Sequence, residues 1–281
     1  MKKILALVLT LSLVFSLAAC GKSAETAKKD GDTASKKVLR VGMECGYAPY
    51  NWAQSSDKNG AVPIKDSADF AYGYDVMMAK YLAEQMGYDL EIQKIEWDSL
   101  PVAVQSGTID CVIAGQSVTS ERLQTVDFTT PYYYASIVAL TKKGSPYENA
   151  KSVADLKGAV CTSQLNTIWY TVCLPQIENA DIKPAMESAP SMLVALESGK
   201  VDLVVTDQPT ALGAVAAYPD MAPITLSDGD FKVSEEEINI GISVKKGNQE
   251  LLDALNAGLA KLTKDDFTKM MDEAIKLSAT L

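Results

Sequence analysis

Two stretches of this chain repeat one pattern: SLPVAVQSGTIDCVIA at residues 99–114 and SMLVALESGKVDLVVT at residues 191–206. Their offset is 92 residues, and seven of the sixteen positions are identical. Each stretch is typical of an amphipathic helix, a glycine that ends it, and a strand opened by Ile or Val plus Asp. The repetition predicts two similarly built lobes with one sheet each, although any helix–glycine–strand unit shares some of these features.

Strand and helix patterns alternate on either side of the repeat. Apolar positions at helical spacing run over Tyr74–Met86, and Gly87 provides the stop. The other expected elements are strands at 38–41, 90–95, 109–114, 158–162 and 181–186, and helices at 98–106, from Thr167 and at 208–217. This order predicts an α/β fold with parallel, doubly wound sheets.

Two connections between the lobes are expected. The run Ala135–Thr141 is typical of a strand that leaves the first lobe, and Ile238–Val244 is typical of a strand that returns to it. The last helices, at 248–262 and 265–277, should then pack on the first lobe. We therefore predict a first lobe of residues 38–141 plus 241–281, a second lobe of residues 142–240, and a hinge and a cleft between them.

The first residues predict export. Lys2 and Lys3 precede a short apolar run, ILALVLTLSLVFSL at residues 4–17, which small residues connect to Cys20 and Gly21. This order predicts a signal peptide at residues 1–19. It resembles the bacterial lipobox, in which the cysteine carries a lipid that tethers a soluble domain. Residues 20–37 hold no large apolar side chain and are expected to form a flexible tether.

Composition narrows the function further. The net charge is −10 and only two of the 281 residues are arginine, a poor basis for binding nucleic acid. The chain has no histidine, and its cysteines match no zinc pattern. Cys111 lies in an apolar run and is expected in the core, whereas a disulfide between Cys161 and Cys173 stays open. No metal or organic cofactor is expected.

Polar residues follow the two repeated strands, at the strand ends where open α/β sheets bind ligands. Ser117 and Arg122 follow the first strand, and Asp207 follows the second. A guanidinium and a carboxylate on opposite lobes suit a zwitterion, and arginine grips a carboxylate with two parallel hydrogen bonds. Each residue also has a simpler interpretation: Arg122 as a surface charge, and Ser117 and Asp207 as helix N-caps.

Aromatic residues gather near the end of the first strand, at Tyr47, Tyr50 and Trp52, and Trp97 follows a later strand. Most such residues are core. The position of Tyr47 and Trp97 at strand ends favours walls of a cleft, where rings stack on a ligand side chain.

Together these motifs resemble family 3 of the extracellular solute-binding proteins, the polar amino-acid-binding components of ABC importers. The resemblance covers residues 38–278. It rests on Gly73–Val76 opening a helix, although Met77 stands where the family usually has an acid, and on Trp97–Leu100, Ser106–Gly107, Ile109–Asp110, Ser117–Thr119, Glu121–Arg122 and Val126–Thr129. It implies a two-lobed, periplasmic-binding-protein-like fold of type II, each lobe a doubly wound sheet with a hinge between.

The resemblance also implies a role for each matching position. Tyr47 and Trp97 would sandwich the ligand side chain. Ser117 and Arg122 would hold the ligand carboxylate. Three further positions complete the implied site: the Gly115 carbonyl for the ligand amine, Asp207 for the same ammonium group, and Thr167 for the carboxylate.

Specificity stays open at this level. In the second lobe Asn166 precedes Thr167 where the family commonly has glycine; asparagine tolerates a left-handed backbone, which would preserve the turn. An acid at Glu44 would favour Lys, Arg or ornithine, whereas Gln116 and Gln164 would suit a polar amide. Trp169 would narrow the far end of the pocket.

The resemblance implies binding rather than catalysis: a lipid-anchored, extracytoplasmic monomer that closes on an amino acid and delivers it to an ABC permease. Two alternatives remain. A dehydratase-like enzyme would need a general acid, for which only Glu44 or Asp207 could serve. A ligand sensor would have to act through a partner receptor.

Overall fold

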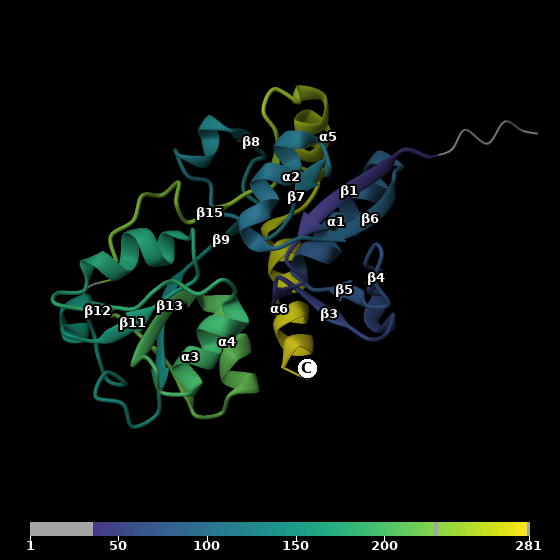
Figure 1. Cartoon of the computed structure of the whole chain (residues 1–281). Coiled ribbons are helices and arrows are strands. Elements are labelled where there is room, and N and C mark those ends of the chain that lie inside the picture. Colours follow the sequence, from purple (N-terminus) through teal and green to yellow (C-terminus); the bar gives the residue numbers. More distant parts are fainter. Residues whose placement is uncertain (1–35, 228–229, 280–281) are drawn as a thin grey trace, which may run out of the picture. The chain divides into compact units, whose positions relative to one another are not determined.

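The computed structural model describes residues 36–227 and 230–279 of the chain (Figure 1). The predicted signal peptide, the predicted lipidation site Cys20 and the start of the predicted tether lie outside these residues. The described part belongs to one compact unit, Lys36–Leu281, of mixed α/β structure. Among the described residues, no helix is both long and apolar enough to cross a membrane.

The first main sheet has the strand order β6-β1-β7-β16-β8. Its parallel part joins β1 (Val38–Met43) to β6 (Asp89–Lys94) on one side and to β7 (Cys111–Val112) on the other. The strand β16 (Ser243–Lys245) then pairs antiparallel with both β7 and β8 (Val126–Phe128). Helix α2 (Leu100–Ser106) packs on this sheet.

The second main sheet has the order β12-β11-β13-β10-β14. Here β11 (Val160–Thr162) pairs in parallel with β12 (Asp181–Ile182) and β13 (Leu203–Asp207). The strands β10 (Ile137–Lys142) and β14 (Met221–Ile224) extend it antiparallel. Helices α3 (Ala189–Glu197) and α4 (Gln208–Ala217) pack on this sheet.

The repeated stretches occupy equivalent places in the two sheets. Cys111 pairs with Val41 in the first sheet, and Leu203, 92 residues later, pairs with Cys161 in the second. The shared aspartates also act alike. The Asp110 carboxylate accepts a bond from the Arg40 amide at 2.8 Å, and that of Asp202 accepts one from the Val160 amide at 2.9 Å. The repeat therefore specifies how each helix returns to its sheet.

The chain crosses between the two sheets along a short antiparallel pair, β9 (Tyr133–Tyr134) with β15 (Asn239–Ile240). The sequence-based boundary was wrong in one respect. We expected residues 135–141 in the first lobe, but β10 pairs with β13 and β14 in the second sheet. The crossing precedes this strand because Tyr133 and Tyr134 already pair with the returning chain.

A third, four-stranded sheet that the sequence did not predict lies between β1 and the first long helix. It has the order β2-β3-β5-β4: β2 (Gly46–Tyr47), β3 (Asn51–Gln54), β5 (Phe70–Tyr72) and β4 (Val62–Pro63). The helix that follows, α1 (Tyr74–Met86), contacts α5 (Gln249–Leu259) and α6 (Lys264–Ser278) of the expected first lobe, but α6 also packs against α4 of the second lobe.

Several predicted elements are shorter, divided or differently wound: the strand expected at 109–114 is only β7, and the run 238–244 is divided between β15 and β16. The strand expected at 181–186 ends at Ile182, because Pro184 has no amide hydrogen to donate to a ladder. The helix expected from Thr167 is a π-helical turn, Trp169–Cys173, followed by a 3-10 turn, Leu174–Gln176. Pro175 lies in that last turn, where it removes a donor of a continuous α-helix.

The four cysteines of the described part, Cys45, Cys111, Cys161 and Cys173, are all free and buried. The prediction of Cys111 as a core residue is confirmed, and Cys161 and Cys173 do not form a disulfide. Burial raises the pKa of Cys161 and of Cys173 to about 12, so both thiols stay protonated at neutral pH.

Gly73 and Gly87, at the two ends of α1, provide a matched test of backbone packing. Both have positive φ, 128° and 68°. A β-carbon on Gly73 would overlap the Tyr50 carbonyl group, whereas one on Gly87 would meet no atom within 4 Å. We expect Gly73→Ala to lower the free energy of unfolding by about 3 kcal/mol and Gly87→Ala by about 1 kcal/mol, measured by urea denaturation. Equal losses would contradict this account of Gly73.

Candidate functional site

Seven of the ten ligand-contact and specificity residues predicted from the sequence line one small cavity between the two main sheets. Its lining, which also includes Trp169, comes from segments more than a hundred residues apart: Tyr47, Trp97, Gly115, Ser117, Arg122, Gln164, Thr167 and Trp169. The first five follow strands of the first lobe, and the last three follow β11 of the second. The cavity therefore lies at the carboxyl ends of the strands, as open α/β sheets predict.

Gly115 has a steric reason to be glycine. Its φ is 61°, and a β-carbon there would lie 2.8 Å from Cε1 of the Tyr47 ring. The backbone of this turn therefore lies directly against the ring, and Gly115 and Tyr47 border the same cavity.

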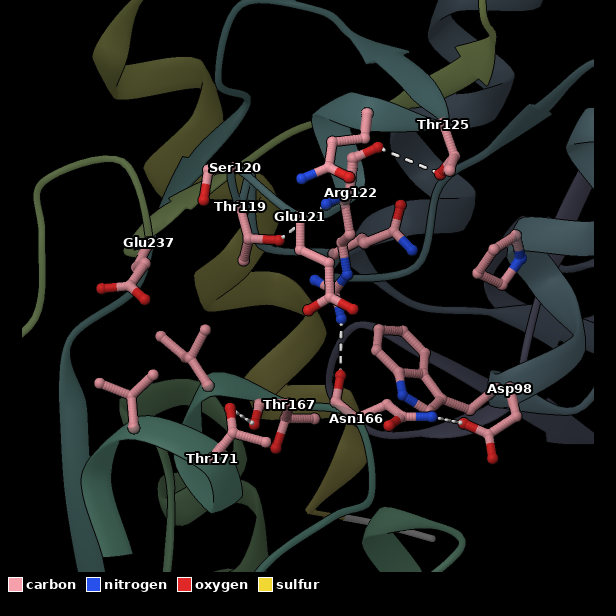
Figure 2. A pocket seen from close by; sticks show the side chains of 16 residues that line it. Asp98, Thr119, Ser120, Glu121, Arg122, Thr125, Asn166, Thr167, Thr171 and Glu237 are labelled. Atoms are coloured by element: carbon pink, nitrogen blue, oxygen red, sulfur yellow. Dashed lines mark hydrogen bonds between the residues drawn. The ribbon is translucent and has the colours of Figure 1, made fainter. Parts of the chain in front are cut away.

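Arg122 brings a positive charge to the cavity without an ion-pair partner. Its Nη1 donates to the Ser117 carbonyl at 2.8 Å, and its Nη2 donates across the cleft to the Asn166 carbonyl at 2.7 Å (Figure 2). The guanidinium also lies 5.4 Å from the centre of the Trp97 ring. Burial lowers the pKa of Arg122 to about 10, opposed by the Glu121 carboxylate. No ion pair of Arg122 occurs within residues 36–227 and 230–279.

Asp207 brings a buried carboxylate to the opposite side. It ends β13 and caps α4, where it accepts bonds from the amide and hydroxyl of Thr210 at 2.9 and 3.0 Å. The N-cap interpretation is thus confirmed. The Tyr47 hydroxyl donates to the same carboxylate from the first lobe. Burial raises the pKa of Asp207, and none of its contacts in the described chain is a cation.

Three consecutive residues of the second lobe, Gln164–Asn166, make most of the side-chain hydrogen bonds across the cleft. The Gln164 amide donates to Glu44 at 3.2 Å, and the Leu165 carbonyl accepts from Trp97 Nε1 at 2.9 Å. Asn166 accepts the Arg122 bond described above, and its side chain donates to Asp98 at 2.7 Å. Its φ of 54° confirms the left-handed turn expected there.

Glu44 lies behind Gln164 and is 5% exposed. Burial, the largest effect, raises the pKa of Glu44 to about 7; the Gln164 bond and Lys94 lower it, and Glu96 and Asp98 raise it. This acid therefore changes charge near neutral pH, directly beside a residue that lines the cavity.

Gln116 does not line the small cavity. It borders an adjoining groove of about 510 Å³ that shares Trp97, Arg122 and Thr167 with the cavity (Figure 2). Its buried Oε1 has no hydrogen-bond partner among the described residues. In Figure 2 the groove is bordered by hydroxyl groups and by Asp98, Glu121 and Glu237, and apolar residues, Pro101, Ile168 and Val172 among them, complete its wall.

Sequence reasoning missed two buried polar residues next to the site, Asn51 and Asp75. Both are fully buried, and their side chains bond each other at 2.7 Å. The signal for Asp75 was present in the Gly73–Val76 motif, but nothing local showed which residues it would contact. Asn51 lies in the four-stranded sheet that the sequence did not predict.

Two lobes joined by a double crossing, with one cavity lined from both, are the architecture of a solute-binding protein. Residues 39–275 match the family model of bacterial extracellular solute-binding proteins, family 3. The chain belongs to this family. The named relatives and solved structures below are transport binding proteins, and they support a role as the binding component of an ABC transporter.

Among relatives, the chain is 28% identical to the L-cystine-binding protein TcyJ of Escherichia coli, over 84% of this chain and 81% of that protein. It is 29% identical to the arginine-binding extracellular protein ArtP of Bacillus subtilis, over 93% of each. Among solved structures, AbpA of Streptococcus pneumoniae bound to L-arginine has a TM-score of 0.73 at 28% identity, covering 86% of this chain and 96% of that one. An ancestral arginine-binding protein bound to arginine has a TM-score of 0.67 at 32% identity, covering 85% and 98%.

The raised pKa of Glu44 makes a prediction about stability. The folded chain binds this proton more tightly than the unfolded chain, so its contribution to stability is present below pH 4.5 and is lost as pH rises through 7. We expect Glu44→Gln to match the parent protein at pH 4 and to be more stable at pH 8, by at most about 3 kcal/mol. Urea denaturation at both pH values measures this, with exposed Glu235→Gln as the control. An equal effect at both values would contradict it.

Proposed function

We propose that this protein is the extracytoplasmic binding component of an importer and that it closes its cleft on an α-amino acid with a cationic side chain. The observation that carries the proposal is a pair of charges without an ion-pair partner in the described chain: the Arg122 guanidinium, which lines the cavity, and the Asp207 carboxylate, which contacts Tyr47 of the cavity wall. Buried charges are costly unless paired, and a zwitterion supplies both partners at once.

The ligand backbone is held from both lobes. Arg122 and the Ser117 turn bind its carboxylate, and Thr167 reaches the same group from the second lobe. Asp207 and the Gly115 carbonyl bind its ammonium. Because these groups come together only when the lobes close, ligand binding favours the closed form. Tyr47 and Trp97 enclose the ligand side chain, since their rings border the cavity.

Glu44 favours a cationic side chain. It is a buried acid without a basic hydrogen-bond partner in the described chain, and Gln164 connects it to the cavity. An incoming guanidinium or ammonium would stabilise its charged form. The names of relatives agree in part, since arginine-, histidine- and cystine-binding proteins are among them. An ancestral relative was also solved with glutamine, and Gln164 makes a polar amide the second candidate.

Delivery and anchoring complete the proposal. The closed form passes its ligand to the membrane subunits of an ABC permease. A lipid on Cys20 holds the monomeric protein at the outer face of the membrane. Support for the anchor is the sequence order of a charged start, an apolar run and a small-residue approach to Cys20.

A screen of ligands tests the binding role. We expect one or a few amino acids, L-arginine among them, to raise the melting temperature, because a ligand that binds only the folded state stabilises it by mass action. Arg122→Lys should weaken binding at least about tenfold, since lysine cannot form two parallel bonds to a carboxylate. Titration calorimetry measures the affinity.

The other arginine of the chain provides a matched control. Arg40 pairs with Asp110 at 2.6 Å, away from the cleft, so Arg40→Lys should leave affinity unchanged. No thermal shift with any of the twenty amino acids would refute the amino-acid proposal.

The choice of ligand side chain is tested by pH. Binding a cation lowers the pKa of Glu44, so affinity for L-arginine should be full at pH 8 and fall as pH drops through 7 toward 5.5, by about tenfold per pH unit at most. Asp207 contributes its own pH dependence, and comparison with Glu44→Gln isolates the part due to Glu44. If Glu44→Gln binds L-arginine with unchanged affinity and pH profile, Glu44 does not select the ligand.

A further inference from the structure

One buried carboxylate outside the cavity contacts both ligand-facing turns of the first lobe through one intermediate residue each. Asp75, in the first turn of α1, is fully buried and makes no ion pair among the described residues. Its Oδ1 accepts a bond from the Tyr132 hydroxyl at 2.6 Å, and its Oδ2 accepts one from the Asn51 side-chain amide at 2.7 Å. Burial raises its pKa to about 6, and these two bonds and a further one from the Gly115 backbone amide oppose that rise.

Each of these two partners also accepts a hydrogen bond from a backbone amide of the site. The Tyr132 hydroxyl accepts a bond from the Gly115 amide at 3.0 Å. The Asn51 side-chain carbonyl accepts one from the Cys45 amide at 2.7 Å. Gly115 begins the turn that leads to Ser117, and Cys45 lies between Glu44 and Tyr47. Both turns contain a residue with positive φ, 61° at Gly115 and 52° at Cys45, and strand pairing holds only their far ends, at Gly46–Tyr47 with β3 and at Ser117 with Ile240.

The direction of these bonds depends on the carboxylate. An ionised carboxylate only accepts hydrogen bonds, so Tyr132 must direct its hydrogen, and Asn51 its NH₂ group, toward Asp75. Consequently the oxygen of each partner faces the backbone amide that needs an acceptor. A neutral amide at position 75 would have one donor group and one acceptor. Its donor group would therefore reverse the direction of the hydrogen bond with either Tyr132 or Asn51.

The residues next to Asp75 in the Gly73–Val76 motif also hold Tyr132 in place. Gly73 allows α1 to start against the Tyr50 carbonyl, as described above. Tyr74 stacks on Tyr132 with ring centres 5.7 Å apart, and its hydroxyl donates to the Tyr132 carbonyl at 2.6 Å. Residues 73–75 thus hold Tyr132 by its backbone, its ring and its hydroxyl.

We propose that Asp75 is a positioning residue of the binding site, which orients the Glu44–Tyr47 and Gly115–Ser117 turns through Asn51 and Tyr132. This rests on the proposed function for its effect on ligand affinity, but its effect on the two backbone amides is independent of any ligand.

The test is an exchange of acid and amide between positions 75 and 51 in the full chain. In Asp75→Asn, the new NH₂ group faces either Asn51, whose own NH₂ then turns toward the Cys45 amide, or Tyr132, whose hydroxyl hydrogen then loses its acceptor. In Asp75→Asn with Asn51→Asp, the amide at 75 donates to the new acid, which accepts from Cys45, and Tyr132 keeps its direction. Net charge and side-chain size are conserved, so the double variant is a matched rescue of the single one.

Hydrogen exchange of the ligand-free protein, followed by mass spectrometry, measures the turns directly. We expect Asp75→Asn to speed exchange in segment 44–47 or 113–117 by about tenfold and the double variant to restore it. Tyr132→Phe should speed exchange in 113–117 alone, which keeps the test decisive if Asp75→Asn fails to fold. Unchanged exchange in both segments, or a double variant no better than the single one, would overturn the proposal.

Calorimetry with L-arginine follows the consequence for binding. Affinity should fall about tenfold in Asp75→Asn and return to within about threefold of the parent protein in the double variant. A loss of affinity without faster exchange in either segment would overturn the positioning role. If the parent protein fails to bind L-arginine, the ligand class fails, whereas the exchange results still decide the role of Asp75.

Discussion

Two charged groups without an opposite charge as partner among the described residues, Arg122 and Asp207, are the constraint on which the site depends. Arg122 donates to carbonyl groups and Asp207 accepts from hydroxyl and amide groups, so each keeps hydrogen bonds but neither meets an opposite charge in the described chain. Neutral partners compensate only part of the cost of burying a charge. A cleft built in this way favours molecules that carry both a carboxylate and an ammonium, because an analogue without one of them leaves a charge unpaired.

The fold positions these groups by repeating one unit. In each lobe a helix ends near a glycine with positive φ, Gly107 or Gly199, and an aspartate then bonds the backbone amide of the neighbouring strand. The strand after it directs its carboxyl end toward the cleft, with the Gly115 turn on one lobe and Asp207 on the other. Four side-chain hydrogen bonds between the lobes involve Gln164–Asn166, and helix α6 also packs against α4 of the second lobe.

Beneath the site, buried polar groups form a hydrogen-bond network in which the carboxylate fixes the direction of each hydrogen bond. The contact of Asp75 with Asn51 and Tyr132 satisfies every donor that faces it, which is the condition under which a buried polar network stabilises one conformation. Glu44 differs, since its single hydrogen bond to Gln164 and its raised pKa leave it ready to respond to a ligand. In our two proposals, burial serves positioning at Asp75 and ligand selection at Glu44.

The sequence by itself determined the local units: α1 with its stop at Gly87, the repeated helix–glycine–strand, and the polar residues that follow each strand. Periodicity and turn residues act over a few positions, so a single chain displays them directly. Only the tertiary structure decided that residues 137–142 belong to the second sheet, that four short strands form between β1 and α1, and that Asp75 contacts Tyr132. These features depend on which distant segments meet, and antiparallel strands that return from another lobe carry the same alternation as any other strand.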